Sequence, residues 1–361
     1  MASAFKNILR VAMMTDSAVE IRSVYKIFGP RPETVIDFVK SGLSKQQLME
    51  DHGHVLGLEN VNIEIAAHEI QVIMGLSGSG KSTLIRHINR LIEPTSGQIL
   101  VGGKNVLSMD KKELMNFRRF DASMVFQKFS LMPHRTVAEN VAYGLEIQKI
   151  DKQITHQRSR RWIDRVGLSG FEKYYPAQLS GGMQQRVGLA RALATDADIL
   201  LMDEPFSALD PLIRTDMQDV LLSLQEELNK TIIFITHDLD EALRIGDSVA
   251  ILKDGVIVQK GSPQTIILNP VDDYVAAFTK DINRGRVLEV GSIMDAQISD
   301  HHLMIEKGMV VEEALQILVR EGETSASVVN NSKTVGSIDI GPLIASLARP
   351  EITNTTNGEE N

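Results

Sequence analysis

The residues best suited to chemistry in this chain are glycines and serines that lead to a lysine. They extend from Gly75 to Ser82 with the sequence GLSGSGKS. Glycines let backbone N–H groups turn inward around a phosphate chain, and a helix starting behind them adds a partial positive charge. Lys81 can reach the β- and γ-phosphates, and the Ser82 hydroxyl is an oxygen ligand for Mg²⁺. The segment therefore predicts a nucleoside triphosphate site.

The flanking segments have the order that a phosphate loop requires. Residues 70–74 are an apolar run typical of a buried strand, and Leu84, Ile85 and Ile88 recur at helical spacing. The alternative interpretation, a flexible Gly/Ser linker, does not explain a position between a buried strand and an amphipathic helix. We expect a strand, a phosphate loop and a helix.

A second small and polar segment lies about one hundred residues further on. Residues 179–185 have the sequence LSGGMQQ and precede an expected helix over 186–194. Ser180 and the two glycines after it would present a hydroxyl and N–H groups at the helix N-terminus, which favours an anion. Capped helices often begin this way, so this segment alone is weak evidence for an anion site. The residues that follow it strengthen that interpretation.

Two carboxylates end another predicted strand. The apolar residues 199–202 are followed directly by Asp203 and Glu204. Ligands of open parallel sheets bind at the carboxyl ends of the strands. We expect Asp203 to hold Mg²⁺ opposite Ser82, and Glu204 to orient or deprotonate an attacking water.

A histidine ends one more predicted strand. After Glu204 we predict a turn over residues 207–210 and, further on, a buried strand over residues 231–235, which leads to Thr236, His237 and Asp238. A single histidine after a strand is more often structural. Here it is the fourth polar group at the same sheet edge, so we expect it to belong to the site.

The N-terminal part of the chain predicts a sheet with an insertion. Residues 19–28 alternate like an edge strand, and residues 58–65 form a second strand. Between them, about residues 31–54 predict a packed helical pair, with a capping box of Ser44 and Gln47. Phe28 precedes a Gly-Pro turn, where its ring could stack on a purine or cap a small core.

Further elements follow the phosphate loop. We predict a strand at 98–101, a charged helix at 111–117 and a strand at 122–126 that ends at Gln127. The stretch after Gln127 is partly apolar and contains Pro133. A basic helical stretch with Arg158, Arg160, Arg161 and Trp162 is interpreted as a solvated face.

The composition of the chain argues against several kinds of site, partner and targeting segment. The chain has 361 residues, enough for two or three domains, and 43% of them are hydrophobic. It has no cysteine, so disulfides, thiolate metal sites and cysteine nucleophiles are excluded. A net charge of −9 argues against nucleic acid as a partner. Lys6 and Arg10 interrupt the apolar N-terminal stretch, so we expect neither a membrane span nor an export signal.

The ordered motifs resemble those of ATP-binding cassette (ABC) ATPases over about residues 19–283. The resemblance implies an α/β fold, a P-loop NTPase ABC nucleotide-binding domain with a RecA-like core, an antiparallel β subdomain and a helical signature subdomain. It implies ATP and Mg²⁺ as cofactors, with Mg²⁺ held by Ser82, Gln127 and Asp203. The expected ATP contacts are the ring of Phe28 and the Walker A residues Gly75, Leu76, Ser77, Gly78, Ser79, Gly80, Lys81, Ser82 and Thr83.

The same resemblance implies the remaining roles. Catalytic functions are expected for Glu204, His237, Gln127 and Lys81, and Asp210 belongs to the D-loop. The signature residues, expected to act on the nucleotide of a partner chain, are Ser180, Gly181, Gly182 and Gln184. Met183 stands in the signature where glutamine is commoner, at a position that should not contact phosphate.

The phosphate-loop helix, the stretch after Gln127 and the insertion resemble ATPase subunits of bacterial importers for glycine betaine, proline, choline and related compatible solutes. Those subunits usually continue into two CBS modules, and residues 286–348 resemble one. There we predict strands at 287–294, 325–329 and 334–340 and helices at 311–318 and 343–348. The expected domains are an N-terminal extension (1–18), an ATPase domain (19–285), this CBS-like segment and a disordered tail (349–361).

The CBS-like segment is strongly acidic. From Arg286 onward the chain has five basic and twelve acidic residues. In the resembling importers this region is associated with sensing internal ionic strength, so docking of the segment is expected to depend on salt. The alternative is a dimerisation or stability appendage.

The motif count predicts how the chain works. One phosphate loop and one signature imply a two-fold, head-to-tail dimer in which each chain completes the site of the other. The motion would pass to separate transmembrane subunits through the apolar residues Phe129, Leu131 and Met132, at the cytoplasmic face of the membrane, and a substrate-binding protein would be an indirect partner. The alternatives are an ABC-type ATPase for another substrate class, such as amino acids, and a non-transport ABC ATPase.

Overall fold

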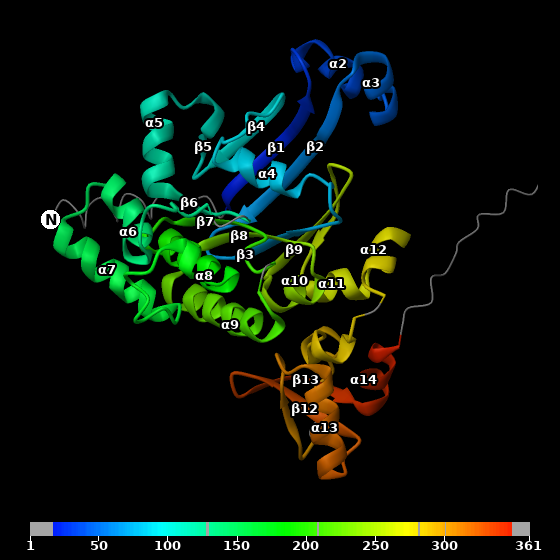
Figure 1. The fold of residues 1–361 in the computed structure, drawn as a ribbon. Coiled ribbons are helices and arrows are strands. Elements are labelled where there is room, and N and C mark those ends of the chain that lie inside the picture. The colour runs from blue at the N-terminus through cyan, green and yellow to red at the C-terminus, as the bar shows by residue number, and fades with distance from the viewer. Residues whose placement is uncertain (1–16, 128–129, 208, 281, 300, 349–361) are drawn as a thin grey trace, which may run out of the picture. The chain divides into compact units, whose positions relative to one another are not determined.

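A computed structural model of the protein describes residues 17–348 apart from 128–129, 208, 281 and 300. Most of the predicted N-terminal extension, Phe129 and the predicted tail therefore lie outside the described residues. The chain divides into two compact units, Met1–Lys260 and Gly261–Asn361. Each unit is described separately below (Figure 1).

The first unit is built on a six-stranded sheet with the order β10-β9-β3-β8-β7-β6. Strands β3, β8, β9, β7 and β6 pair in parallel, and every residue of β3, β7 and β8 is buried. Near-continuous apolar strands are typical of a parallel sheet covered by helices on both faces. The bounds are β3 (Ile70–Met74), β6 (Ala122–Val125), β7 (Ile199–Asp203), β8 (Thr231–Thr236), β9 (Ser248–Lys253) and β10 (Val256–Gly261).

The helices of the first unit fall into two groups (Figure 1). Those next to the parallel sheet are α4 (Lys81–Ile88), α9 (Pro211–Leu228) and α10 (Leu239–Ile245). Helices α6 (Val137–Ile147), α7 (Lys152–Arg165) and α8 (Gly181–Ala194) pack against one another beside the strand β6. In this group the aromatic ring of Trp162 is buried, while Arg160 and Arg161 are exposed as expected for a solvated face.

A four-stranded antiparallel sheet has the order β2-β1-β4-β5. Its strands are β1 (Ser17–Phe28), β2 (Val55–Ala66), β4 (Ser96–Val101) and β5 (Lys104–Asn105). The prediction that residues 19–28 form an edge strand is wrong, because β1 lies between β2 and β4, with Ile21 opposite both Ile63 and Ile99. Alternating burial gives the same pattern in a central strand whose second face is open, so alternation alone does not identify an edge.

The predicted helical insertion is present. It contains a short 3₁₀ turn (Pro32–Thr34), α2 (Ile36–Lys40) and α3 (Lys45–His52), and the Ser44–Gln47 capping box forms as predicted. Val35, Val39 and Leu48 pack on Ile27 and Leu56 of the antiparallel sheet. After this sheet, the charged helix α5 (Lys111–Asn116) is capped by Asp110 and leads into one π-helical turn, Phe117–Asp121.

The second unit contains a three-stranded sheet with the order β11-β12-β13. Its elements are α11 (Pro263–Leu268), α12 (Asp273–Phe278), β11 (Met304–Glu306), α13 (Val311–Glu321), β12 (Ser325–Asn330), β13 (Lys333–Asp339) and α14 (Ile340–Leu347). Helices α13 and α14 and strands β12 and β13 match the predicted ranges closely, whereas α11, α12 and β11 were not predicted.

The strand predicted at 287–294 is wrong. This region contains two 3₁₀ turns, Arg284–Arg286 and Val290–Ser292. Leu288 and Val290 are fully buried, and this spacing of two imitates a strand in the sequence. The N–H of Leu288 instead donates to the Arg284 carbonyl at 2.9 Å, as in a helical turn.

Candidate nucleotide site

The phosphate loop connects β3 to α4 and depends on glycine at two close approaches. A Cβ at Gly75 would lie 2.1 Å from the Leu252 carbonyl oxygen, and one at Gly80 would lie 2.8 Å from the Gly57 carbonyl oxygen. Both glycines also have positive φ, 156° and 104°. Larger residues would therefore push the loop out of the position in which its N–H groups surround an anion.

Lys81 is the first residue of α4 and lies inside the loop. Its ammonium group donates to the carbonyl oxygens of Gly75 at 2.7 Å and Leu76 at 3.0 Å. Burial lowers the pKa of Lys81, and the nearby charges of Glu204 and Asp203 raise it. A buried cation that is bonded only to neutral carbonyls is well placed to exchange them for phosphate oxygens.

Ser79 provides a test of whether the loop fits a phosphate. Its hydroxyl is buried and has no hydrogen-bond partner among the described residues. Its backbone carbonyl is held by the Gly255 N–H at 2.8 Å, so the loop is fixed while the hydroxyl stays available. A buried polar atom without a partner is costly, and a phosphate oxygen would satisfy it.

Asp203, the last residue of β7, is fully buried and holds two groups of α4. Its Oδ1 accepts a hydrogen bond from the Ser82 hydroxyl at 2.7 Å. Its Oδ2 accepts from the Arg86 guanidinium at 3.0 Å. The predicted Ser82–Asp203 pair is thus brought together, whereas the sequence reasoning missed Arg86. Its spacing of four residues from Ser82 on a predicted helix was the available signal.

The Glu204 carboxylate lies close to two further predicted site residues. Its Oε2 accepts a hydrogen bond from Gln127 Nε2 at 2.9 Å and lies 3.4 Å from His237 Nδ1. The Glu204 backbone has a φ of 48°, an unusual value for a residue with a side chain. The amide of Gln127 after β6, the carboxylate of Glu204 after β7 and the imidazole of His237 after β8 therefore lie close together.

Metal binding at this edge would rely on few protein ligands. In residues 17–348, outside the gaps, no group of three or more His, Asp or Glu side chains is placed to hold a metal ion. Ser82 and Asp203 nevertheless offer two adjacent oxygens beside the phosphate loop. This donor set suits Mg²⁺, which keeps several waters and takes further ligands from phosphate.

Phe28 is the last residue of β1, and its side chain is 40% exposed. A Cβ at Gly57 would come within 2.6 Å of the ring, so the glycine in β2 lets the ring lie against that strand. The ammonium group of Lys26 lies 5.0 Å from the ring centroid. This exposure favours the predicted stacking role over the alternative of a core cap.

The signature segment and the D-loop each contain the residue that caps the N-terminus of a helix. Ser180 caps α8 by accepting from the Met183 N–H at 3.3 Å, and Asp210 caps α9 by accepting from the Ile213 N–H at 3.1 Å. A Cβ at Gly182 would lie 2.9 Å from Leu209, so the two segments are neighbours. Gln184 donates to the carbonyl oxygens of Pro176 and Leu179, which holds it against its own segment.

A parallel sheet, a phosphate loop after a buried strand and carboxylates at the next strand ends define a P-loop nucleoside triphosphatase. The family model described as "ABC transporter" matches residues 58–207. The glycine betaine transport ATP-binding protein of Bacillus subtilis (strain 168) is 50% identical, over 92% of this chain and 77% of the relative. The chain belongs to the ATP-binding proteins of ABC transporters, an ATPase class that works as dimers with transmembrane permease subunits.

Other similar proteins agree with this family. The trimethylamine N-oxide transport system ATP-binding protein of Pelagibacter ubique (strain HTCC1062) is 44% identical, over 92% of this chain and 97% of the relative. A solved dimeric ATP-binding cassette in a post-hydrolysis state, bound to ADP and Pi, matches with a TM-score of 0.59. It is 32% identical and covers 68% of this chain and 98% of its own. These findings confirm the predicted family and the ABC ATPase fold.

No helix in the part of the chain that the structure describes is long and apolar enough to cross a bilayer.

Proposed function

We propose that this chain is the ATPase subunit of an importer for glycine betaine or a related compatible solute such as choline, a betaine or trimethylamine N-oxide. Relatives named for glycine betaine and trimethylamine N-oxide transport align over 92% of the chain. A relative named for methionine import aligns over only 63% of it. The longer alignments include residues beyond the cassette, which favours the compatible-solute class over the amino-acid alternative.

The observation that carries the catalytic proposal is the convergence of side chains on Glu204. In our proposal the Glu204 carboxylate orients and deprotonates the attacking water, while Gln127 and His237 hold that carboxylate in place. Lys81 gives up its two carbonyl contacts for the β- and γ-phosphates. Ser82, Asp203 and Gln127 would hold Mg²⁺, which neutralises developing charge on the phosphate oxygens.

The same proposal requires a head-to-tail dimer. Ser180 and Gly181 are exposed at the start of α8, where the helix N-terminus favours an anion. The signature residues of one chain would bind the nucleotide held by the phosphate loop of its partner. We place this dimer at the cytoplasmic face of the plasma membrane, on the permease subunits, with a binding protein as an indirect partner.

We further propose that residues 130–136 and the pocket beside them form the permease contact. Asn140 of α6 is fully buried and fixes this loop, since its side chain bonds the N–H of Met132 and the carbonyl oxygens of Met132, Arg135 and Thr136. Arg191 of α8 donates to the Ser130 carbonyl at 2.8 Å. The loop is thus tied both to α6 and to the signature helix α8.

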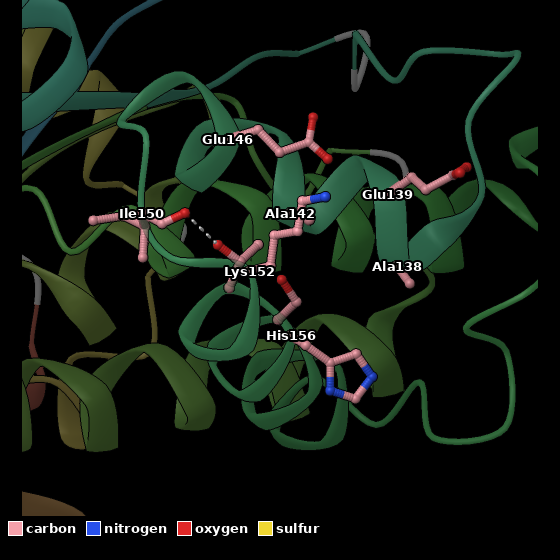
Figure 2. Close-up of a pocket in the computed structure, with 9 residues that line it drawn as sticks. Ala138, Glu139, Ala142, Glu146, Ile150, Lys152 and His156 are labelled. Atoms are coloured by element: carbon pink, nitrogen blue, oxygen red, sulfur yellow. Dashed lines mark hydrogen bonds between the residues drawn. The ribbon is translucent and has the colours of Figure 1, made fainter.

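The pocket lies between α6 and α7 and has a volume of about 500 Å³ (Figure 2). Ala138 and Ala142 leave the space open on the α6 side, and His156 of α7 lines the opposite side. Glu139 and Glu146 place carboxylates at its border, and Glu146 is paired with Arg135 at 2.7 Å. A concave surface with a fixed loop beside it suits a projecting segment of another subunit.

Transport measurements test the proposed function. The chain would be assembled with its permease and binding protein in vesicles, and ATP hydrolysis would be measured with glycine betaine, choline, proline or trimethylamine N-oxide, and with methionine as the comparison. We expect stimulation by at least one quaternary ammonium compound or N-oxide and none by methionine. Stimulation by methionine alone would contradict the proposed substrate class.

A further inference from the structure

Helices α9 and α10 both begin beside candidate site residues. Asp210 of the D-loop caps α9, and Asp238, which follows His237, caps α10. Arg214, in the first turn of α9, reaches both starting points. Its Nη1 donates to Asp238 Oδ2 at 2.9 Å, and its Nη2 donates to the Leu209 carbonyl at 3.4 Å.

These contacts continue on both sides to Glu204. On one side, His237 lies next to Asp238 in the chain, and its Nδ1 is 3.4 Å from Glu204 Oε2. On the other side, Ser207 precedes Leu209 by two residues, and its hydroxyl donates to the Glu204 carbonyl at 3.0 Å. Together with the chain connections from His237 to Asp238 and from Ser207 to Leu209, these four contacts form a closed ring that starts and ends at Glu204 and passes through Arg214.

Asp238 is the rigid member of this ring. Its Oδ1 accepts from the Glu241 N–H at 3.1 Å, and its own N–H donates to Thr236 Oγ1 at 3.0 Å. Arg214 takes the second carboxylate oxygen, so Asp238 is held by α10, the end of β8 and α9 together. Because both carboxylate oxygens and the backbone N–H of Asp238 are bonded, the residue has little freedom to rotate, which also restricts the neighbouring His237.

We propose that Arg214 is a positioning residue for ATP hydrolysis, which sets His237 against Glu204 through Asp238 and holds the D-loop through Leu209. This inference rests on the catalytic role proposed for Glu204. Arg214 contacts the loops that present the site residues. Loss of the contact is expected to lower the turnover number and leave nucleotide affinity unchanged, because the phosphate loop lies on other elements.

The same two helices contain a matched control. Arg244 of α10 pairs with Asp219 of α9 at 2.8 Å and also donates to Gln218 at 2.8 Å. The side chains of Arg244 and Arg214 are similarly exposed, 39% and 30%. The Arg244 pair joins α9 to α10 further along both helices and contacts neither the D-loop nor His237, so it reports the structural value of such a pair alone.

The test compares Arg214→Gln, Arg214→Lys, Asp238→Asn and the double variant R214Q/D238N with Arg244→Gln. Each full-length chain, assembled with its permease, is assayed for kcat and KM of ATP hydrolysis, nucleotide affinity and Tm. We expect R214Q and D238N each to lower kcat about tenfold or more, with KM within about threefold of wild type. The double variant should lose no more than the larger single loss, because the two residues act as one unit.

The controls decide between positioning and simple stabilisation. R244Q should keep kcat within about twofold while shifting Tm as much as R214Q does. Arg214→Lys should recover part of kcat, since an ammonium group can still pair with Asp238. Equal loss of kcat in R214Q and R244Q, or additive losses in the double variant, would overturn the inference. A wild-type assembly without ATP hydrolysis would refute the proposed function itself, and this inference with it.

Discussion

At the scale of single residues, Glu204 is the point where the ends of three strands meet. Gln127 and His237 come from segments far from Glu204 in the chain, and both approach the same carboxylate oxygen. Its left-handed backbone conformation is expensive for a glutamate and is retained because Ile235 and Ser207 bond its main chain. Such a conformation indicates that the direction of the carboxylate matters.

The first prediction concerns the charge of this carboxylate. Glu204→Gln keeps the size of the side chain and an acceptor oxygen for Gln127, but it removes the base. We expect kcat to fall by about 100-fold or more, because general base catalysis typically contributes that factor, while nucleotide affinity stays within about threefold. ATP hydrolysis would be measured from the phosphate that is released, and light scattering would detect a stable ATP-bound dimer.

The matched comparison is Lys81→Ala, which removes the buried ammonium group of the phosphate loop. This variant should lose nucleotide affinity, measured with a fluorescent ATP analogue, and should form no ATP-bound dimer. If Glu204→Gln hydrolysed ATP within about tenfold of wild type, Glu204 would not be the base.

The second prediction concerns His87, which lies on α4 behind the phosphate loop and is fully buried. Burial lowers its pKa to about 4, the bond to the Thr83 carbonyl opposes this shift, and the charge of Lys26 adds to it. A base with a lowered pKa in the folded protein is protonated more readily when unfolded. The contribution of neutral His87 to the free energy of unfolding is therefore fully present above pH 6.5 and is lost as the pH falls toward 4.

His87→Gln removes this titration while keeping a side chain that can bond the Thr83 carbonyl. Between pH 7 and pH 4 the wild-type chain should lose roughly 3 kcal/mol more unfolding free energy than the variant, since one pKa unit corresponds to about 1.4 kcal/mol. Denaturant unfolding at several pH values measures this difference. Parallel stability curves for the two proteins would show that His87 is not responsible.

Residues with a local signal were predictable, and residues with distant partners were not. The phosphate loop is recognisable because strand, glycines and helix follow one another within twenty residues. Arg86, Asn140 and Arg214 were missed, because their partners belong to other elements and become neighbours only in the fold. Arg86 had one available signal, its spacing of four residues from Ser82, whereas Arg214 and Asn140 give no pattern that distinguishes them from solvent-exposed residues.

At the scale of elements, the buried strands of the parallel sheet were the most predictable part. Residues 70–74, 199–202 and 231–235 are buried throughout and apolar apart from Gln71 and Thr231, as expected of strands covered on both faces. Half-buried segments were harder to predict from the sequence. Strand β1 has one open face, so its place in the middle of a sheet depends on β2 and β4, which no local pattern reveals. In the second unit, buried Leu288 and Val290 imitate a strand while their backbone forms turns.

The third prediction tests the pocket between α6 and α7 as a permease contact. Ala142→Trp would fill the pocket with an aromatic ring without touching the nucleotide site. We expect solute-stimulated ATP hydrolysis and transport to fall about tenfold, while nucleotide affinity of the isolated chain stays within about twofold. Copurification of the chain with its permease subunits should decrease in parallel.

Ala67→Trp is the control for this variant, because Ala67 is also half-buried but lies in the turn after β2. It should leave transport unchanged. A large drop in Tm of the isolated Ala142→Trp chain, with normal complex formation, would identify the pocket as part of a local core rather than a contact surface.

At the scale of the whole molecule, charge distinguishes the two ends of the chain. The segment from Arg286 onward has five basic and twelve acidic residues, although the entire protein has a net charge of only −9. Docking of so acidic a segment on another surface depends on ionic strength, because the screening length of about 10 Å at 0.1 M shortens as salt is added. None of the side-chain contacts described above for the candidate nucleotide site involves a described residue of this segment.

The fourth prediction is that a chain truncated before Val287 loses its response to salt. Arg284 donates to the carbonyl oxygens of Ile267 and Ala348, so the cut removes one of its two partners, and the Tm of the truncated chain must be checked first. The assembled transporter is then assayed for ATP hydrolysis over about 0.05–0.5 M salt, a range in which the screening length falls to less than half. We expect the full-length complex to change its rate with salt and the truncated complex to keep a constant rate. An equal salt response in both complexes would rule out sensing by this segment and favour an appendage that only stabilises or dimerises the subunit.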